Sequence, residues 1–106
     1  MIANAWNNGG TTYGISVGRQ NRDAFFDRSW GEIEVEVEGE FHRIPITEGF
    51  WNKCPEFRSP VIRQWLARHA TLTWIKGKPP KAELVPLGGN RFRLVPAPII
   101  NPPPHA

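Results

Sequence analysis

The chain has few of the residues that cross-link or anchor a protein. Only one of its 106 residues is a cysteine, Cys54, so no disulfide can form within the chain. A small secreted domain normally carries an even set of cysteines, and a reducing compartment is therefore favoured. No stretch reaches the roughly eighteen apolar residues that a membrane span needs, and residues 1–18 contain no basic start followed by an apolar run. We expect a soluble, cytoplasmic protein with no membrane partner.

Motifs that define a reaction are also missing. Cys54, His42 and His69 are the only thiol and the only imidazoles in the part expected to fold, and a nucleophilic pair would need them adjacent in space. We expect His42 and His69 to be partly buried core-facing side chains and Cys54 to pack as a small hydrophobe. No cysteine pair or helical histidine pair suggests a metal site, and residues 88–90 lack the lysine and helix of a phosphate loop. The sequence predicts a protein that is not an enzyme, with no catalytic residue, metal or cofactor.

Charge is unevenly distributed along the chain. The run "EIEVEVEGE", residues 32–40, places a glutamate at every second position and holds half of the ten acidic residues. Alternate residues of a strand stand about 7 Å apart, near the spacing of glycosidase carboxylates. A catalytic pair needs one carboxyl in a cleft, and a hard cation needs a loop of ligands, so a solvated strand face is the better interpretation. The other residues carry thirteen Lys and Arg against five acids, a balance of +8.

The glutamate run predicts the first strand of a hairpin whose second strand is residues 41–46. A turn at Glu38-Gly39 with an even number of loop residues puts the apolar residues of both strands on one face. Arg43 then lies across from Glu34 or Glu36, on the wet face. An odd loop would move a complete apolar set into water, so the even register is expected.

A helix is predicted at residues 60–69, because Ser59 is a good cap and Pro60 suits the first turn. Its core-facing positions at helical spacing are Val61, Ile62, Trp65, Leu66 and His69. Strands are predicted at residues 12–17 and in a second hairpin at 82–96, with Phe92 and Leu94 facing the core. Residues 19–30 suit a short helical turn or irregular corner. We predict an α+β domain: a small antiparallel sheet or open β-barrel of about five strands, with the helix packed on it. Parallel pairing is not expected, because the crossover helices it would need are absent.

Three segments divide the chain. Residues 1–11 are rich in Asn and Gly and are predicted to be a flexible arm, in which Trp6 either docks on the core or is a chance aromatic. Residues 12–96 form the single domain. Residues 97–106, with four prolines, are predicted to be a disordered tail, the alternative being a polyproline ligand.

Basic residues interleaved with aromatics are the strongest functional indication. We predict a non-enzymatic domain that binds nucleic acid through a basic face. The candidate residues are Arg63, Arg68, Lys76, Lys78, Lys81, Arg91 and Arg93. Two alternatives stay open: a protein-interaction adaptor that uses Trp-rich loops and self-associates or binds a protein partner, and a barrel that holds a small molecule.

Overall fold

The computed structural model describes residues 1–98. Within that range the chain forms seven strands and three short helices. In chain order they are β1 (Ile2–Asn7), β2 (Tyr13–Ser16), α1 (Arg19–Phe25), β3 (Glu32–Val37), β4 (Glu40–Pro45), α2 (Glu48–Asn52), β5 (Glu56–Arg58), α3 (Pro60–His69), β6 (Lys81–Gly88) and β7 (Arg91–Pro96).

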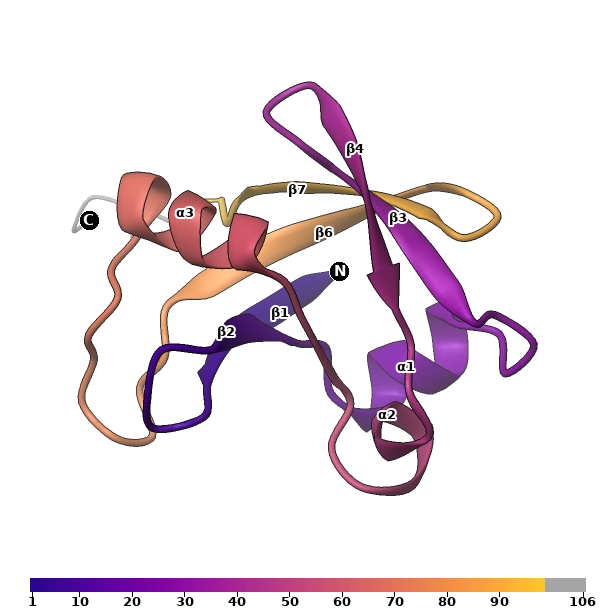
Figure 1. Ribbon diagram of the computed structural model, residues 1–106, viewed down its shortest axis with the longest axis horizontal. Coiled ribbons are helices and arrows are strands. Elements are labelled where there is room, and N and C mark those ends of the chain that lie inside the picture. Colours follow the sequence, from indigo (N-terminus) through magenta and orange to yellow (C-terminus); the bar gives the residue numbers. More distant parts are fainter. Residues whose placement is uncertain (99–106) are drawn as a thin grey trace, which may run out of the picture.

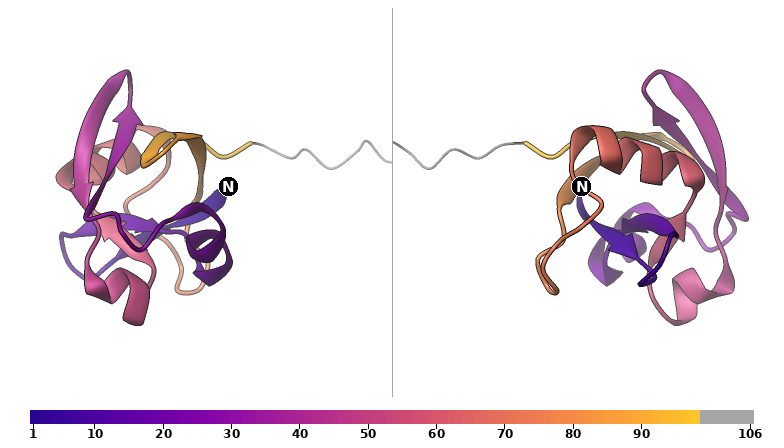
Figure 2. Two further views of the ribbon diagram at one scale, coloured as in Figure 1. Left: turned by 90° about the vertical axis from the view of Figure 1, so that its right-hand side faces the viewer. Right: turned by 60° about the vertical axis from the view of Figure 1, so that its left-hand side comes forward.

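All these strands join one sheet in the order β4-β3-β7-β6-β1-β2-β5. The sheet curls until its edge strands, β4 and β5, lie against each other, which makes a nearly closed barrel (Figures 1 and 2). Helix α3 packs beside β2, whereas α1 and α2 lie at the lower end of the view in Figure 1. The predicted α+β class and open barrel are confirmed, with more strands than the expected five.

The β3–β4 hairpin has the predicted even register. Glu38 and Gly39 form its two-residue loop with φ of 52° and 87°, the positive values that a tight hairpin turn requires. Ile33 lies opposite Ile44, and both side chains are fully buried. His42, on the same face, is partly buried as predicted. The apolar alternation therefore determined which face of the hairpin is wet.

Strand β7 runs parallel to β3, contrary to the expectation that no strands would pair in this way. Glu34 pairs with Arg91, and Glu36 with Arg93. The other strand pairs are antiparallel. The prediction failed because it assumed that a parallel pair requires dedicated crossover helices, whereas the whole segment from β4 to β6, which contains strands and helices, makes this connection.

The predicted flexible arm at residues 1–11 is wrong for most of its length. Strand β1 pairs with β6 on one side and β2 on the other, so it lies inside the sheet. Ala3 and Ala5 are only 2% and 5% exposed. The hydrophobic pattern is weak here because the buried side chains are alanines, although the backbone pairing on both sides holds the strand.

Helix α3 begins and packs as predicted. The Ser59 hydroxyl accepts a hydrogen bond from the Val61 N–H at 3.4 Å, and Pro60 occupies the first turn. The buried side chains of the helix are Ile62, Trp65 and Leu66. His69 is an exception: it was expected to face the core, but it is exposed in the last turn and bonds to Glu38. Cys54 is also exposed rather than packed.

Aromatic rings fill one end of the core. Phe26 stacks on Phe92 with ring centroids 4.9 Å apart and lies 5.0 Å from Phe50. Leu94 is buried with Phe92, as the alternation of the second hairpin predicted. Phe25 ends α1 and is exposed while Phe26 is buried, which explains why neighbouring phenylalanines can occupy this corner.

No helix within residues 1–98 is long and apolar enough to cross a membrane. Most of the predicted tail, residues 99–106, lies outside the described residues.

Candidate functional site

The seven basic residues predicted to bind nucleic acid do not share one environment. Arg91 and Arg93 lie on β7 beside the glutamates of β3. Arg91 Nε is 2.9 Å from Glu34, and Arg93 Nη2 is 3.0 Å from Glu36. The parallel register produces both ion pairs, because it aligns alternate residues of the two strands on one face. The glutamate stripe and the arginine pair thus largely neutralise each other.

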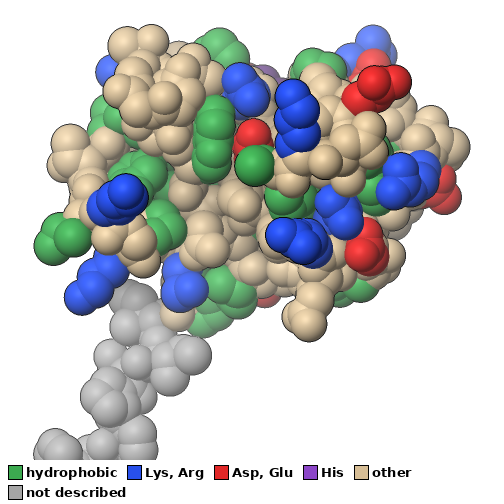
Figure 3. All heavy atoms as spheres, turned by 90° about the horizontal axis from the view of Figure 1, so that it is seen from below, with side chains coloured by type: hydrophobic (Ala, Val, Ile, Leu, Met, Phe, Trp, Pro, Cys, Tyr) green, Lys and Arg blue, Asp and Glu red, His purple; other side chains and the backbone are tan. Residues whose placement is uncertain are grey.

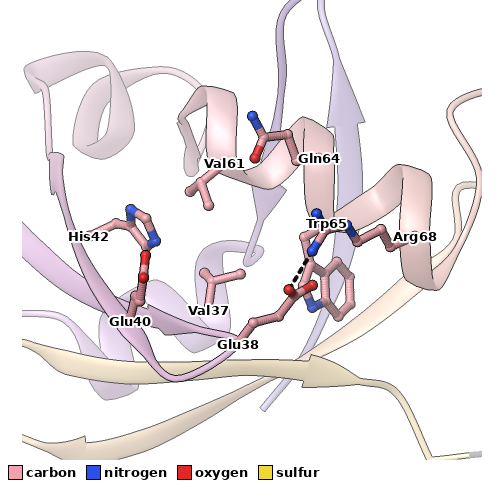
Figure 4. Close-up of a pocket in the computed structure, with 8 residues that line it drawn as sticks. All are labelled: Val37, Glu38, Glu40, His42, Val61, Gln64, Trp65 and Arg68. Atoms are coloured by element: carbon pink, nitrogen blue, oxygen red, sulfur yellow. Dashed lines mark hydrogen bonds and ion pairs between the residues drawn. The ribbon is translucent and has the colours of Figure 1, made fainter.

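Arg68 is also paired with a carboxylate. Its Nη1 lies 2.6 Å from Glu38, and His69 Nε2 lies 3.0 Å from the other oxygen of that carboxylate. Figure 4 shows Arg68 reaching from α3 toward Glu38 at the tip of the β3–β4 hairpin. The hydrogen bond with His69, assisted by Arg68, lowers the pKa of the Glu38 carboxyl below its usual value. The contact ties the hairpin to the helix above a hollow of about 290 Å³.

Arg63, Lys76, Lys78 and Lys81 have a different setting. None of them forms an ion pair with another of residues 1–98. They lie along three hollows that we name by their principal residues: the helix-start hollow (Tyr13, Arg58, Pro60, Arg63), the aromatic hollow (Trp6, Tyr13, Trp74, Lys76) and the lysine hollow (Lys78, Lys81, Pro79). Their volumes are about 410, 780 and 380 Å³. These four basic residues therefore remain available to an external anion.

The three hollows adjoin one another. Tyr13 lines both the helix-start and the aromatic hollow, and Gly77 and Pro79 line both the aromatic and the lysine hollow. None of the described residues that line them is Asp or Glu. In the space-filling view from below, Lys and Arg side chains lie among hydrophobic side chains in the left-hand part, and further Lys and Arg side chains lie on the right among the acidic ones (Figure 3). We call the surface formed by the three hollows the basic-aromatic face.

Three half-buried rings hold the basic-aromatic face in place. The rings of Tyr13 and Trp74 meet edge to face with centroids 6.1 Å apart. The Tyr13 hydroxyl donates a hydrogen bond of 2.8 Å to the Leu72 carbonyl, which fixes the loop between α3 and β6. Trp6 lies on β1, at the wall of the same hollow. Each ring keeps part of its surface exposed, so a flat ligand can stack there.

Arg58 reaches this face across Gly14, which has no side chain. Trp6, Gly14 and Arg58 are paired across β1, β2 and β5, which puts all three on one face. Because Gly14 has no side chain, the Arg58 guanidinium can lie 4.7 Å from the centre of the Trp6 ring. Its other contact is an ion pair of 3.5 Å with Glu56. Arg58 thus adds positive charge beside an aromatic ring.

Trp6, Tyr13, Arg58 and Trp74 were not among the residues predicted to bind. They come from three strands and a loop that meet only in the folded sheet, so no local spacing links them. One feature of the sequence pointed to this site: a tryptophan is unusual in a flexible arm, which suggested that Trp6 docks on the core. In the structure Trp6 lies on β1, at the wall of the aromatic hollow.

The groups considered for catalysis are not assembled into a site. His42 lines the hollow under the β3–β4 hairpin, whereas Cys54 lines a separate hollow beside β5. Within residues 1–98, no group of three or more His, Cys, Asp or Glu side chains has the arrangement of a metal site. The geometry thus gives no support to a Cys–His nucleophile.

Comparison with known proteins adds nothing to this geometry. No family model matches the chain, and no curated protein or solved structure is similar enough to match it.

Proposed function

We propose that the protein is a non-enzymatic domain that binds single-stranded nucleic acid on the basic-aromatic face. The observation that carries the proposal is that three adjoining hollows combine four basic side chains that have no ion pair within residues 1–98, together with Arg58, with three partly exposed rings, and that none of the described residues lining them is Asp or Glu. Proteins that bind single strands use this combination, since cations follow the phosphates and rings stack on the bases.

The two kinds of side chain have separate tasks in this proposal. Arg63, Lys76, Lys78 and Lys81 contact phosphates, and Trp6 and Trp74 offer stacking surfaces. A stacked base contributes about 1–3 kcal/mol. Three to five neutralised phosphates on a single strand give a slope of log K against log salt of about −2 to −3.5. Arg68, Arg91 and Arg93 are left out of the interface because carboxylates already pair with them.

The test is fluorescence anisotropy with labelled DNA and RNA single strands of about twelve nucleotides, within the range of small binding domains. Lys76→Ala with Lys78→Ala should weaken binding and reduce the salt slope by about 1 or more. The charge-matched control is Arg19→Ala with Arg43→Ala, two exposed arginines on α1 and β4 outside the face. Absence of binding to every strand at low salt would refute the proposal.

Stacking is tested separately at Trp6, whose ring is half-buried. Trp6→Leu should weaken binding about fivefold or more, whereas Trp6→Phe, which keeps a ring, should retain most of the affinity. Equal losses in the two variants would show that the ring does not stack on a base.

Protein docking is the second candidate. Ile75 is 74% exposed and adjoins Trp74 in the loop between α3 and β6. Exposed apolar residues beside a tryptophan are typical anchors in protein interfaces. Self-association or a persistent partner detected by light scattering, and lost in Ile75→Ser, would favour this function. The small-molecule barrel has no comparable support, because bulky side chains such as Phe50 and Phe92 lie in the interior.

A further inference from the structure

Strand β4 forms one edge of the sheet, and the half of it next to the turn is exposed. It belongs to the β3–β4 hairpin, which rises above the rest of the molecule in Figures 1 and 2. Phe41 is 49% exposed, and the side chain of Arg43 is 79% exposed. At the far end of the strand, Pro45 lines a hollow together with residues of β5, so the two edges of the sheet approach each other there. The open part of the β4 edge is therefore residues 40–43.

The register of the hairpin determines which backbone groups of β4 point away from β3. In a hairpin with a two-residue turn, the residues that flank the turn exchange backbone hydrogen bonds, and so does every second pair after them. Phe41 and Arg43 lie between those pairs, so their N–H and C=O groups point outward. In agreement, Glu34, which lies opposite Arg43, donates its own N–H to Asn90 on the far side of β3. Pro45, at the next outward position, has no N–H to offer. Within residues 1–98, no strand pairs with this side of β4.

A second copy of β4 matches this edge in one antiparallel register. If Phe41 lies opposite the partner's Arg43, then Arg43 lies opposite the partner's Phe41, and the two strands exchange all four bonds between their outward backbone groups. A register with Arg43 opposite itself would place two like charges side by side, which is unfavourable. A register with Phe41 opposite itself would bring Arg43 against Gly39 of the turn and leave only two bonds. The preferred register is symmetric, so the contact closes as a dimer.

The side chains on the outer face of the hairpin suit the same register. Directly opposite residues of paired strands share a face, so the partner's Arg43 comes beside the exposed ring of Phe41. This ring already attracts a guanidinium, that of Arg91, which lies 5.4 Å from its centre. The next residue in this row of the partner is Glu34, so the partner's Arg43 lies between a ring and a carboxylate. The ion pair that Arg43 now makes, 3.6 Å from Glu32 between two exposed side chains, is of the weak surface kind.

We propose that the protein forms a symmetric dimer in which β4 pairs antiparallel with β4 of a second copy, Phe41 opposite Arg43. The paired segment is short, so the dimer is weak and reversible. Pro45 at one end and the turn at the other end restrict the pairing to this segment, which prevents open-ended association along the edge. The dimer does not depend on the proposed function, because none of the paired residues lines the basic-aromatic face.

The first experiment is sedimentation velocity of the full chain over about 5–500 μM, the range in which a small interface associates. The mean mass should rise with concentration from that of one chain toward that of two. A monomer at every concentration would refute the dimer and leave the edge to a strand of another protein. A dimer that is lost in Ile75→Ser would place the contact in the loop between α3 and β6 and would also refute the proposal.

Two substitutions of Arg43 then separate the backbone from the side chain. Arg43→Pro and Arg43→Ala both remove the guanidinium, but only proline removes the outward N–H, and it leaves the bonds to β3 in place. Arg43→Pro should raise the dissociation constant of the dimer about tenfold or more, since each dimer loses two hydrogen bonds. Arg43→Ala should raise it about threefold or less. Equal effects would show that the backbone of β4 is not the contact. Thermal unfolding checks that both variants stay folded.

Disulfide cross-linking tests the register without a proline. His42 lies opposite itself in the proposed dimer, with Cα atoms about 4.5 Å apart, a distance that a disulfide can bridge. Residue 43 lies diagonal to its own copy at about 7–8 Å, which is too far. In a Cys54→Ser background, which removes the native thiol, His42→Cys should therefore form an intermolecular disulfide much faster than Arg43→Cys. Faster cross-linking at residue 43, or none at either position, would overturn the proposed pairing.

Discussion

Replacing Gly14 with alanine should destabilise the protein. The Gly14→Ala variant should unfold at a lower temperature and at a lower urea concentration than wild type. Gly14 lies in β2 opposite Arg58 of β5, and a Cβ atom built on it overlaps the carbonyl oxygen of Phe57. It would also lie 3.1 Å from the carbonyl carbon of Phe57 and 3.2 Å from the Cα of Arg58. These are backbone atoms, so no side-chain rotation relieves the overlap, and β5 must move away from β2.

The cost follows from this geometry. Overpacking of a fitted site typically costs 1–3 kcal/mol, and a rigid backbone neighbour favours the upper part of that range. The change from glycine to alanine in a strand offsets about 0.5–1 kcal/mol of this cost, because alanine loses less conformational entropy on folding. A net loss of about 2 kcal/mol lowers the melting temperature of a domain of this size by about 8–16 °C. Urea and thermal unfolding measure the two quantities.

The control for Gly14→Ala is Gly31→Ala. Gly31 has no atom within 4 Å of an added Cβ and no positive φ, so its stability should stay within about 0.5 kcal/mol of wild type. If Gly14→Ala is equally harmless, close packing of β5 against Gly14 does not limit the stability of the sheet. A loss in both variants would instead point to a general intolerance of the sheet to added methyl groups.

Two further predictions concern the ion pairs that hold β3. Because hydrogen bonding to His69, with Arg68, lowers the pKa of Glu38 in the folded state, its contribution is present at neutral pH and is lost as the pH falls below about 4.5. The urea midpoint of Glu38→Gln should therefore lie below that of wild type at pH 7, with the two converging at low pH; a constant gap would show that the carboxylate charge is not responsible. A double-mutant cycle of Glu36→Gln and Arg93→Gln should give a coupling of about 0.2–1 kcal/mol that weakens in salt. No measurable coupling would mean that the parallel register, rather than the charge, fixes this contact.

Local patterns predicted the elements whose neighbours along the chain pack together. The β3–β4 register follows from parity, since Ile33 and Ile44 would otherwise be in water, and α3 follows from Ser59 and Pro60 at its start. Both depend on residues within about twenty positions of each other. Their physical causes, burial of one strand face and capping of free N–H groups, are already present in the sequence.

Pairings between distant segments could not be predicted in the same way. Strand β1 was missed because Ala3 and Ala5 are too small to give a strong alternation, and its stability comes from β6 and β2 on either side. The prediction for His69 was wrong because helical spacing alone places it on the buried stripe of α3. In the structure its side chain is exposed in the last turn of the helix and bonds to Glu38 of the hairpin. In each case a tertiary contact outweighed the local pattern.

The parallel pairing of β3 with β7 changes where an anionic partner can bind. The glutamate run leaves the remainder of the chain at +8, and from the sequence alone Arg91 and Arg93 were predicted to belong to a basic face. In the folded sheet these arginines lie beside Glu34 and Glu36, so the two most conspicuous charge patterns cancel locally. Positive charge that stays unpaired beside three aromatic rings is carried by less conspicuous residues of the 70–81 loop, the first residue of β6 and the start of α3: Lys76, Lys78, Lys81 and Arg63. A binding surface is therefore defined by which charges the fold leaves without partners, rather than by where charges are densest along the chain.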